Sequence, residues 1–235
     1  MFNKTTTIYW SYGNTMQIRA EEPAPLLKTY FRDKNPDDYD YNRCPAFAEL
    51  NKNTFSLKSV FDYNLSFDAK DIFEVVSTSQ NQEFFNNMVN MRSYKSRLAS
   101  IEQPFIFIAE EDSLEMEILP SFMENNSFNK TSIFIPGTMD IGKYVRPLDM
   151  AFHCRDNIMK IKEGDIYAYI RFKTDKNIEF KRFTWNDEIA EPIEGVVQGI
   201  KKYRKFKFKP LSWYYKKQQA MKIKQQTLKA IKKQQ

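Results

Sequence analysis

A glycine-rich stretch in the second half of the chain has the spacing of a phosphate-binding loop. Gly137, four further residues, then Gly142 and Lys143 match the start of the signature G-x-x-x-x-G-K-[ST]. In that loop the Lys reaches the terminal phosphates, a Ser or Thr hydroxyl holds Mg²⁺, and a helix begins at the anion. Here Tyr144 stands at the hydroxyl position and Pro147 follows three residues later. We therefore expect a β-turn at the Pro-Gly pair and an extended connection, without a nucleotide site.

A second candidate for chemistry is the only histidine, His153, which precedes Cys154. A single histidine excludes the zinc and iron sites that need two or more of them. Adjacent residues of a strand point to opposite faces, so His153 and Cys154 cannot form a nucleophile–base pair directly. The sequence favours a structural histidine, and it predicts no catalytic residue, no metal ligand and no cofactor.

Acidic residues gather between two apolar stretches and could supply paired carboxylates or oxygen ligands. They are Glu110, Glu111, Asp112, Glu115 and Glu117. The flanking residues indicate a hairpin, so we expect these carboxylates at a solvated tip. The best polar cluster is Lys143, Arg146 and Asp149, which a glycine-rich turn could present to an anion. A structural ion pair between Arg146 and Asp149 is the interpretation we favour.

The strongest global feature is the separation of charge along the chain. No acidic residue follows Glu194, and residues 195–235 contain 13 Lys and Arg. The preceding residues contain 23 basic and 30 acidic side chains, a formal charge of −7, whereas the whole chain has +6. An acidic body with a basic tail indicates an acidic partner, which could be nucleic acid or protein.

The basic tail has three open interpretations. It could be a terminal helix that docks an imperfect apolar stripe on the body, an arm that binds a polyanion, or an amphipathic helix at a membrane surface. The stripe consists of Trp213, Tyr214, Ala220, Met221, Leu228 and Ile231, with Lys217 and Lys224 interrupting it. In a polyanion-binding arm, Trp213, Tyr214 and Tyr215 could stack on bases. Arg204 is the only Arg among the 13 cations, which argues against base readout.

If the tail binds a polyanion, most of the candidate binding residues lie in its first half, and two belong to the glycine-rich stretch. They are Lys143, Arg146, Lys201, Lys202, Arg204, Lys205, Lys207, Lys209, Trp213, Tyr214, Lys216 and Lys217. The same surface could serve self-association or virion assembly.

Short strands dominate the expected elements of the first hundred residues. Residues 5–20 predict two strands around a turn at Gly13-Asn14, and residues 21–38 predict one short helix between prolines. Alternating apolar residues predict two more strands over 53–68. The stretch 79–100 predicts a helix, because its apolar residues have helical spacing and Ser79 can cap it. The residues of that helical face are Phe84, Met88, Met91 and Leu98.

The second half of the chain predicts strands followed by two helices. A hairpin is expected over 105–118, and the stretch from Leu148 to Cys154 predicts a strand that alternates between buried and exposed residues. A turn over 163–165 leads to a strand with Ile166, Ala168, Ile170 and Phe172 inward, and 177–183 predicts one more strand. Helices are expected at about 187–204 and, after Pro210, about 211–233. Short strands without intervening helices indicate antiparallel pairing.

The fold class predicted is mostly β. We expect an antiparallel β-sandwich or jelly-roll-like body over residues 1–186, and a basic segment with one or two C-terminal helices over 187–235. The hydrophobic content of 42% suffices for a core, and no run of 18 apolar residues predicts a membrane span. The first residues lack the apolar stretch of a signal peptide, and the two cysteines have no paired spacing, so we expect reduced cytoplasmic thiols.

Two resemblances extend this interpretation. The stretch "IKEGDIYAYIRF" (161–172) resembles deoxyuridine triphosphatases and deoxycytidine triphosphate deaminases, in which a Gly-Asp turn precedes a core strand. The Ser- and Asp-containing catalytic motifs of those enzymes are not evident. Over most of 40–183 the chain resembles a family of uncharacterised proteins of large tailed phages that infect marine bacteria. The segments concerned are "RCPAFAELNKNTFSLKSVFDYNLSF", "IPGTMDIGKYVRPLDMAF" and "IKEGDIYAYIRFKTDKNIEFKRF". That resemblance implies a phage gene product in a bacterial cytoplasm or a virion, and it implies no enzyme.

The leading functional hypothesis is a non-enzymatic phage protein that binds or assembles with an acidic partner through its surface and its basic tail. Two alternatives stay open. One is an enzyme that acts on a nucleotide or small anion at the turn between Gly137 and Asp149. The other is a purely structural virion component whose tail is packed as part of the core.

Overall fold

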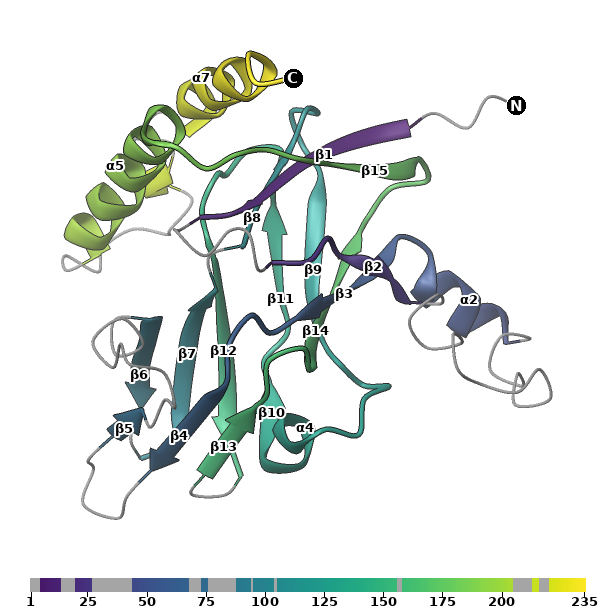
Figure 1. Ribbon diagram of the computed structural model, residues 1–235, viewed down its shortest axis with the longest axis vertical. Helices are drawn as coiled ribbons and strands as arrows, with labels where there is room; N and C mark the ends of the chain where they lie inside the picture. The colour runs from purple at the N-terminus through teal and green to yellow at the C-terminus, as the bar shows by residue number, and fades with distance from the viewer. Residues whose placement is uncertain are drawn as a thin grey trace.

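Four β-sheets form the body of the protein, and two long C-terminal helices lie along one side of it (Figure 1). The computed structural model describes residues 5–13, 20–26, 44–67, 73–75, 88–93, 95–103, 105–155, 158–204, 213–215 and 220–235. The class is mostly β, as the sequence predicts. No helix in these ranges is both long enough and apolar enough to cross a membrane.

The three-stranded sheet next to the helices combines strands from three distant parts of the chain. Its order is β15–β1–β8, with β1 at Thr5–Tyr12, β8 at Phe105–Ala109 and β15 at Asn177–Arg182. β1 pairs with β8 antiparallel but with β15 parallel, in the register Thr5 to Asn177. The expectation of purely antiparallel pairing is therefore wrong at this one position in the described sheets.

The other three sheets are antiparallel. The five-stranded sheet has the order β11–β9–β14–β3–β2, with bounds Gly137–Asp140, Glu115–Pro120, Ile166–Phe172, Thr54–Lys58 and Ala24–Pro25. The four-stranded sheet is β10–β12–β7–β6, at Ser132–Phe134, Leu148–Cys154, Leu98–Gln103 and Val89–Ser93. The last sheet is β13–β4–β5, at Ile158–Ile161, Tyr63–Phe67 and Phe73–Val75.

Alternation of residue types explains which face each strand buries. In β12 the residues Leu148, Met150, Phe152 and Cys154 are buried and those between them are half-buried, as predicted. β14 is buried on both faces, because Ile170 and Phe172 belong to the main core whereas Tyr169 packs in a separate cluster with Leu26. The main core lies between the sheets and contains aromatic contacts such as Trp10 with Phe105 and Phe55 with Phe180.

The helical layer consists of α5 at Asp187–Arg204 and α7 at Ala220–Lys232, which pack against each other (Figure 1). They cover the outer face of the β1–β8 pair, where Tyr9, Ile106 and Ile108 meet Ile189 and Ile231 in one cluster. The alternate residues of the same strands, such as Trp10 and Phe107, face the main core. Both faces of this pair are therefore buried, which accounts for the uninterrupted apolar sequence of β8.

Local sequence accounts for the ends of the helices. Asn186 accepts a hydrogen bond from the amide of Ile189 at 3.2 Å, and acidic residues occupy the first turn of α5. Lys229 and Lys232 lie in the last turn of α7, where cations suit the helix dipole. Two short helices complete the described elements: α2 at Pro45–Asn51 and α4 at Ser127–Thr131. The helix predicted at 187–204 is confirmed. Of the helix predicted at about 211–233, residues 213–215 and α7 are helical, and residues 211, 212 and 216–219 lie outside the described ranges.

The helix predicted over 79–100 is wrong from Val89 onward, whereas Met88 just before that strand is helical. β6 and β7 pair there as antiparallel strands, and Arg97 in the connection between them has a φ of 49°. The register shifts between Met91 and Ser93, so an extra residue breaks the strand alternation. Met91 and Leu98, two residues of the expected helical face, therefore belong to two different strands joined by a turn. Residues 79–87, including Ser79 and Phe84, lie outside the described ranges.

The expected hairpin over 105–118 is also wrong, although both strands exist. β8 pairs with β1, and β9 pairs with β11 and β14, so the acidic turn between them carries the chain from one sheet to another. The two strands predicted within 53–68 are confirmed as β3 and β4. The second strand expected before residue 20 and most of the helix expected over 21–38 lie outside the described residues.

Candidate functional site

The glycine-rich stretch does not have the shape of a phosphate loop. Gly137 begins strand β11, and the tight turn falls at 141–143 rather than at the Pro-Gly pair. The chain after the Pro-Gly pair is extended, as predicted, because it forms β11; residues 144–147 are irregular, and no helix begins there. Gly142 is needed for close packing, because a Cβ at this position would lie 2.6 Å from the backbone of Ser113.

Lys143 of this stretch is bound to a neighbouring carboxylate. Its Nζ donates to Asp140 at 2.6 Å and to the hydroxyl of Ser113 at 3.1 Å. Burial alone would raise the pKa of Asp140, but hydrogen bonds from Lys143, Ser113 and the Leu114 amide outweigh it and hold that pKa below its usual value. Lys143 thus fixes the turn against the acidic segment at 110–113.

Arg146 forms the structural ion pair that the sequence favours. Its guanidinium lies 3.9 Å from Asp149, which also accepts a hydrogen bond from Arg92, and it donates to the hydroxyl of Tyr215 at 3.1 Å. Lys143 and Arg146 therefore pair with two different carboxylates, and they do not converge on one anion site.

The histidine and cysteine of β12 do not form a catalytic pair. His153 is half-buried, and Cys154 lies on the opposite face with no exposure. The prediction that the two side chains point away from each other is confirmed.

The acidic turn after β8 contacts the basic C-terminal helix. Glu110 accepts hydrogen bonds from Lys232 at 2.7 Å and from the hydroxyl of Tyr9 at 3.1 Å. Glu111 pairs with Lys176 at 3.0 Å. The expectation of a simply solvated tip is therefore wrong for both carboxylates, since each is held by a residue from another element.

Two further acidic residues of the predicted cluster lie on strand β9 rather than in the turn. Glu115 pairs with Lys173 at 3.1 Å, and Glu117 pairs with Lys173 at 3.0 Å and with Arg171. These carboxylates stabilise the five-stranded sheet. In the part of the chain described, no three His, Cys, Asp or Glu side chains are placed to hold a metal ion.

The contact between the acidic turn and α7 is centred on Lys224, which is only 1% exposed. Its Nζ donates to the backbone carbonyl of Glu110 at 3.3 Å and to that of Glu111 at 2.5 Å. Burial lowers the pKa of this lysine, while the nearby carboxylates act in the opposite direction. Lys224 interrupts the apolar stripe in the sequence because it caps a turn that lies far away along the chain.

The inner face of α7 confirms the docked interpretation of the last helix, with a shifted set of residues. Its buried residues are Ala220, Lys224, Thr227, Ala230 and Ile231. Met221 and Leu228 of the predicted stripe are only half-buried. The apolar stripe read from the sequence is therefore rotated relative to the face that docks.

The aromatic residues ahead of α7 differ in exposure. Tyr214 and Tyr215 are buried against Val196 and Ile200 of α5. Trp213 is 40% exposed, so it is the aromatic residue of the three that can reach a ligand.

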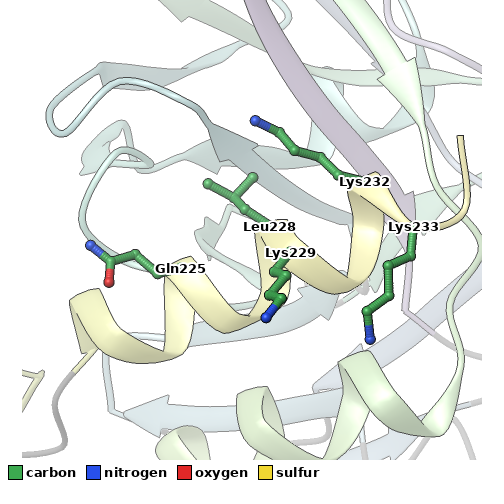
Figure 2. A pocket seen from close by; sticks show the side chains of 5 residues that line it. All are labelled: Gln225, Leu228, Lys229, Lys232 and Lys233. Atoms are coloured by element: carbon green, nitrogen blue, oxygen red, sulfur yellow. The ribbon is translucent and has the colours of Figure 1, made fainter.

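The outer face of α7 carries the cations of the helix. Lys222, Lys229, Lys232 and Lys233, the last directly after the helix, are exposed and fall within about 100° of the helix circumference; we call these four residues the basic face. An open pocket of about 500 Å³ lies along the basic face (Figure 2). The pocket is lined by Gln225, Leu228, Lys229, Lys232 and Lys233. In Figure 2 Lys233 extends toward α5, where it pairs with Glu188 at 2.9 Å.

The candidate binding residues from the sequence have a mixed outcome. Lys201, Lys202 and Arg204 lie in the last turn of α5, but their side chains are outside what the structure describes. Five others lie outside the described residues: Lys205, Lys207, Lys209, Lys216 and Lys217. The prediction from sequence missed the basic face. The sequence nevertheless indicates this face, because Lys229, Lys232 and Lys233 have the spacing i, i+3, i+4 and therefore share one side of a helix.

This arrangement can bind an extended anion without doing chemistry on it. A row of lysines on a docked helix is a fixed positive surface, and the sequence that precedes the helix is rich in further cations. No protein-family model matches the chain, and no curated protein matches its sequence.

Proposed function

We propose that the protein binds nucleic acid without acting on it chemically, and that it does so through the basic face of α7 and the adjoining segment 201–217. One observation carries this proposal: α7 docks its inner face on the body and leaves four lysines on its outer face, in a helix that contains no acidic residue. A docked helix keeps those charges in place before the ligand arrives, which limits the entropy cost of binding.

The anchoring of the neighbouring segment supports the same proposal. Ile200 near the end of α5 and Tyr214 before α7 are both buried in one cluster, so the chain leaves and returns to the body at one place. The stretch of sequence between these two residues contains six cations and no acidic residue. Ile200 and Tyr214, the buried residues at the two ends of this stretch, therefore belong to the same helical layer as the basic face.

The residue types favour phosphate contacts over base recognition. Lysine is a point charge with no preferred partner geometry, whereas base readout in a groove relies on the bidentate fork of arginine. Trp213 adds one exposed ring that can stack on an unpaired base. We infer a preference for single strands and little dependence on sequence. In keeping with the resemblance over 40–183, we assign this activity to a phage protein that acts in the host cytoplasm or in the virion.

The test is fluorescence anisotropy with a labelled single-stranded DNA of mixed sequence at about 50 mM salt. The wild-type protein is expected to bind, with an affinity that falls as salt rises, by about 0.7 log units per log unit of salt for each phosphate contact. The variant K222Q/K229Q is expected to bind more weakly, with a slope shallower by about 1.4.

The matched control is K143Q/K173Q, which removes the same charge from lysines that body carboxylates already hold. Equal weakening by both double variants would show a general charge effect and contradict the proposed interface. No binding by the wild type would contradict the function itself. Poly-glutamate as a competitor separates the partners: efficient displacement of the DNA at equal charge would contradict a preference for nucleic acid and favour an acidic protein.

A further inference from the structure

Two of the four lysines of the basic face are already paired with carboxylates of the protein. Lys232 pairs with Glu110 at 2.7 Å, and Lys233 pairs with Glu188 at 2.9 Å. The other two lysines of the face have no such ion pair with a described residue. Half of the face is therefore neutralised by groups that belong to other elements, the acidic turn after β8 and the first turn of α5.

The Glu110 pair differs from the Glu188 pair in how firmly the carboxylate is held. Glu110 accepts a second hydrogen bond from Tyr9, on the sheet that α7 covers. Glu188 and Lys233 are both more than half exposed, so water screens their attraction. The hydrogen bond from Lys232 lowers the pKa of Glu110, and burial opposes it only in part, so this carboxylate stays charged at neutral pH.

These pairs are not what holds α7 in place. The helix docks through Ile231, which is fully buried, and through Lys224, which donates to two backbone carbonyls of the acidic turn. Those carbonyls remain acceptors whatever side chain stands at position 110. Loss of the Glu110 carboxylate would therefore free the amino group of Lys232 without releasing the helix.

We propose that Glu110 is an internal competitor that occupies Lys232 in place of a phosphate and so weakens the binding of nucleic acid to the basic face. Glu188 acts in the same way on Lys233, with a smaller effect. The inference rests on the proposed function and concerns its regulation. A nucleic acid must displace Glu110 before it gains a contact with Lys232, so the affinity of the wild-type protein is set below what its four lysines could provide.

The experiment compares E110Q, E188Q and the wild type by anisotropy with the same single-stranded DNA at about 50 mM and about 150 mM salt. One additional phosphate contact steepens the salt slope by about 0.7 and raises affinity roughly eightfold at the lower and fourfold at the higher salt concentration. We expect E110Q to show this full gain and E188Q a smaller one. Glutamine keeps an oxygen that accepts from Tyr9, and a melting curve close to that of the wild type verifies that α7 stays docked.

Two further variants test whether the gain in affinity of E110Q comes from the release of Lys232. E49Q removes the same charge from α2, which lies across the body from α5 and α7 (Figure 1), and is expected to leave affinity unchanged. K232Q/E110Q is expected to bind no better than K232Q, because the lysine that Glu110 releases is gone. Binding by the wild type with no gain in E110Q, or a gain that persists without Lys232, would overturn this inference and leave the proposed function standing. No binding by any variant would overturn both.

Discussion

Two places in the molecule concentrate cations, and they differ in where the neutralising carboxylates come from. In the stretch from Gly137 to Asp149, Lys143 and Arg146 each pair with an acid three residues away. In α7 no acid is present, so only distant parts of the chain can neutralise the lysines, through Glu110 and Glu188. The first region neutralises its own cations, and the second retains exposed positive charge.

The difference shows why a motif alone misleads. The glycine-rich stretch has the spacing of a phosphate loop, yet its lysine serves the turn and its second glycine serves packing against Ser113. The C-terminal helix matches no motif, yet its geometry leaves a row of lysines facing outward. Whether a cation can bind a ligand depends on the nearest acid in space and on the face of the element that carries it.

The largest expected effect comes from detaching α7, because the basic face exists only while this helix is docked on the body. Ile231 is fully buried between the sheet and α5, so Ile231→Ala is expected to lower the free energy of unfolding by about 2–5 kcal/mol. Chemical denaturation measures this. The exposed Lys229→Ala serves as the control, with an expected change within about 0.5 kcal/mol. Equal stability of the two variants would mean that α7 is not part of the folded core.

The next effect concerns the buried lysine of α7. Lys224→Ala leaves the carbonyls of Glu110 and Glu111 without their donor and opens a cavity, which is expected to cost about 2–3 kcal/mol of stability. Lys224→Met keeps most of the volume of the side chain and is expected to cost less. Denaturation curves of both variants measure the difference. A stability loss in the methionine variant as large as that of alanine would locate the whole effect in the hydrogen bonds.

A smaller effect is expected in the glycine-rich stretch, where the ion pair between Asp140 and Lys143 contributes to stability. Asp140 has a lowered pKa, so the stability that it contributes is fully present above its ordinary value of 3.8 and is lost as pH falls through the lowered value. Asp140→Asn is expected to cost about 1–2 kcal/mol at pH 7. The difference from the wild type should shrink as pH falls from about 5 toward 2. Denaturation curves across this range measure it, and a difference that does not change with pH would contradict the ion pair with Lys143.

Much of this architecture can be predicted from local sequence. Alternation in Leu148–Cys154 predicts β12 and its buried face. Asn186 and the acidic residues Asp187 and Glu188 that follow it mark the start of α5. Local pattern fails between Met91 and Leu98, where apolar residues at helical spacing belong to two paired strands and the register shift after Met91 removes a clear alternation.

The docking of α7, by contrast, cannot be predicted from local sequence. The acceptors of Lys224 lie 113 and 114 residues earlier in the chain. Only the tertiary fold brings Lys224 close to these carbonyls. In the sequence, Lys224 therefore appears only as a charged residue that interrupts an apolar stripe. Lys232 pairs with the residue whose carbonyl Lys224 also contacts, and the partner of Lys233 lies 45 residues earlier in the chain. The candidate site could therefore be recognised from sequence as a set of cations but not as a partly neutralised surface.

Chemical labelling tests directly whether the basic face of α7 binds nucleic acid. The lysines are modified with an amine-reactive reagent, with and without single-stranded DNA, and the extent of labelling at each lysine is measured by mass spectrometry. Lys222 and Lys229 are exposed on the basic face, whereas Lys143 and Lys173 are exposed on the body and paired with carboxylates. If DNA binds the basic face, it protects Lys222 and Lys229 from labelling and leaves the labelling of Lys143 and Lys173 unchanged. Equal protection at all four sites, or protection of Lys143 and Lys173 alone, would contradict binding at the basic face.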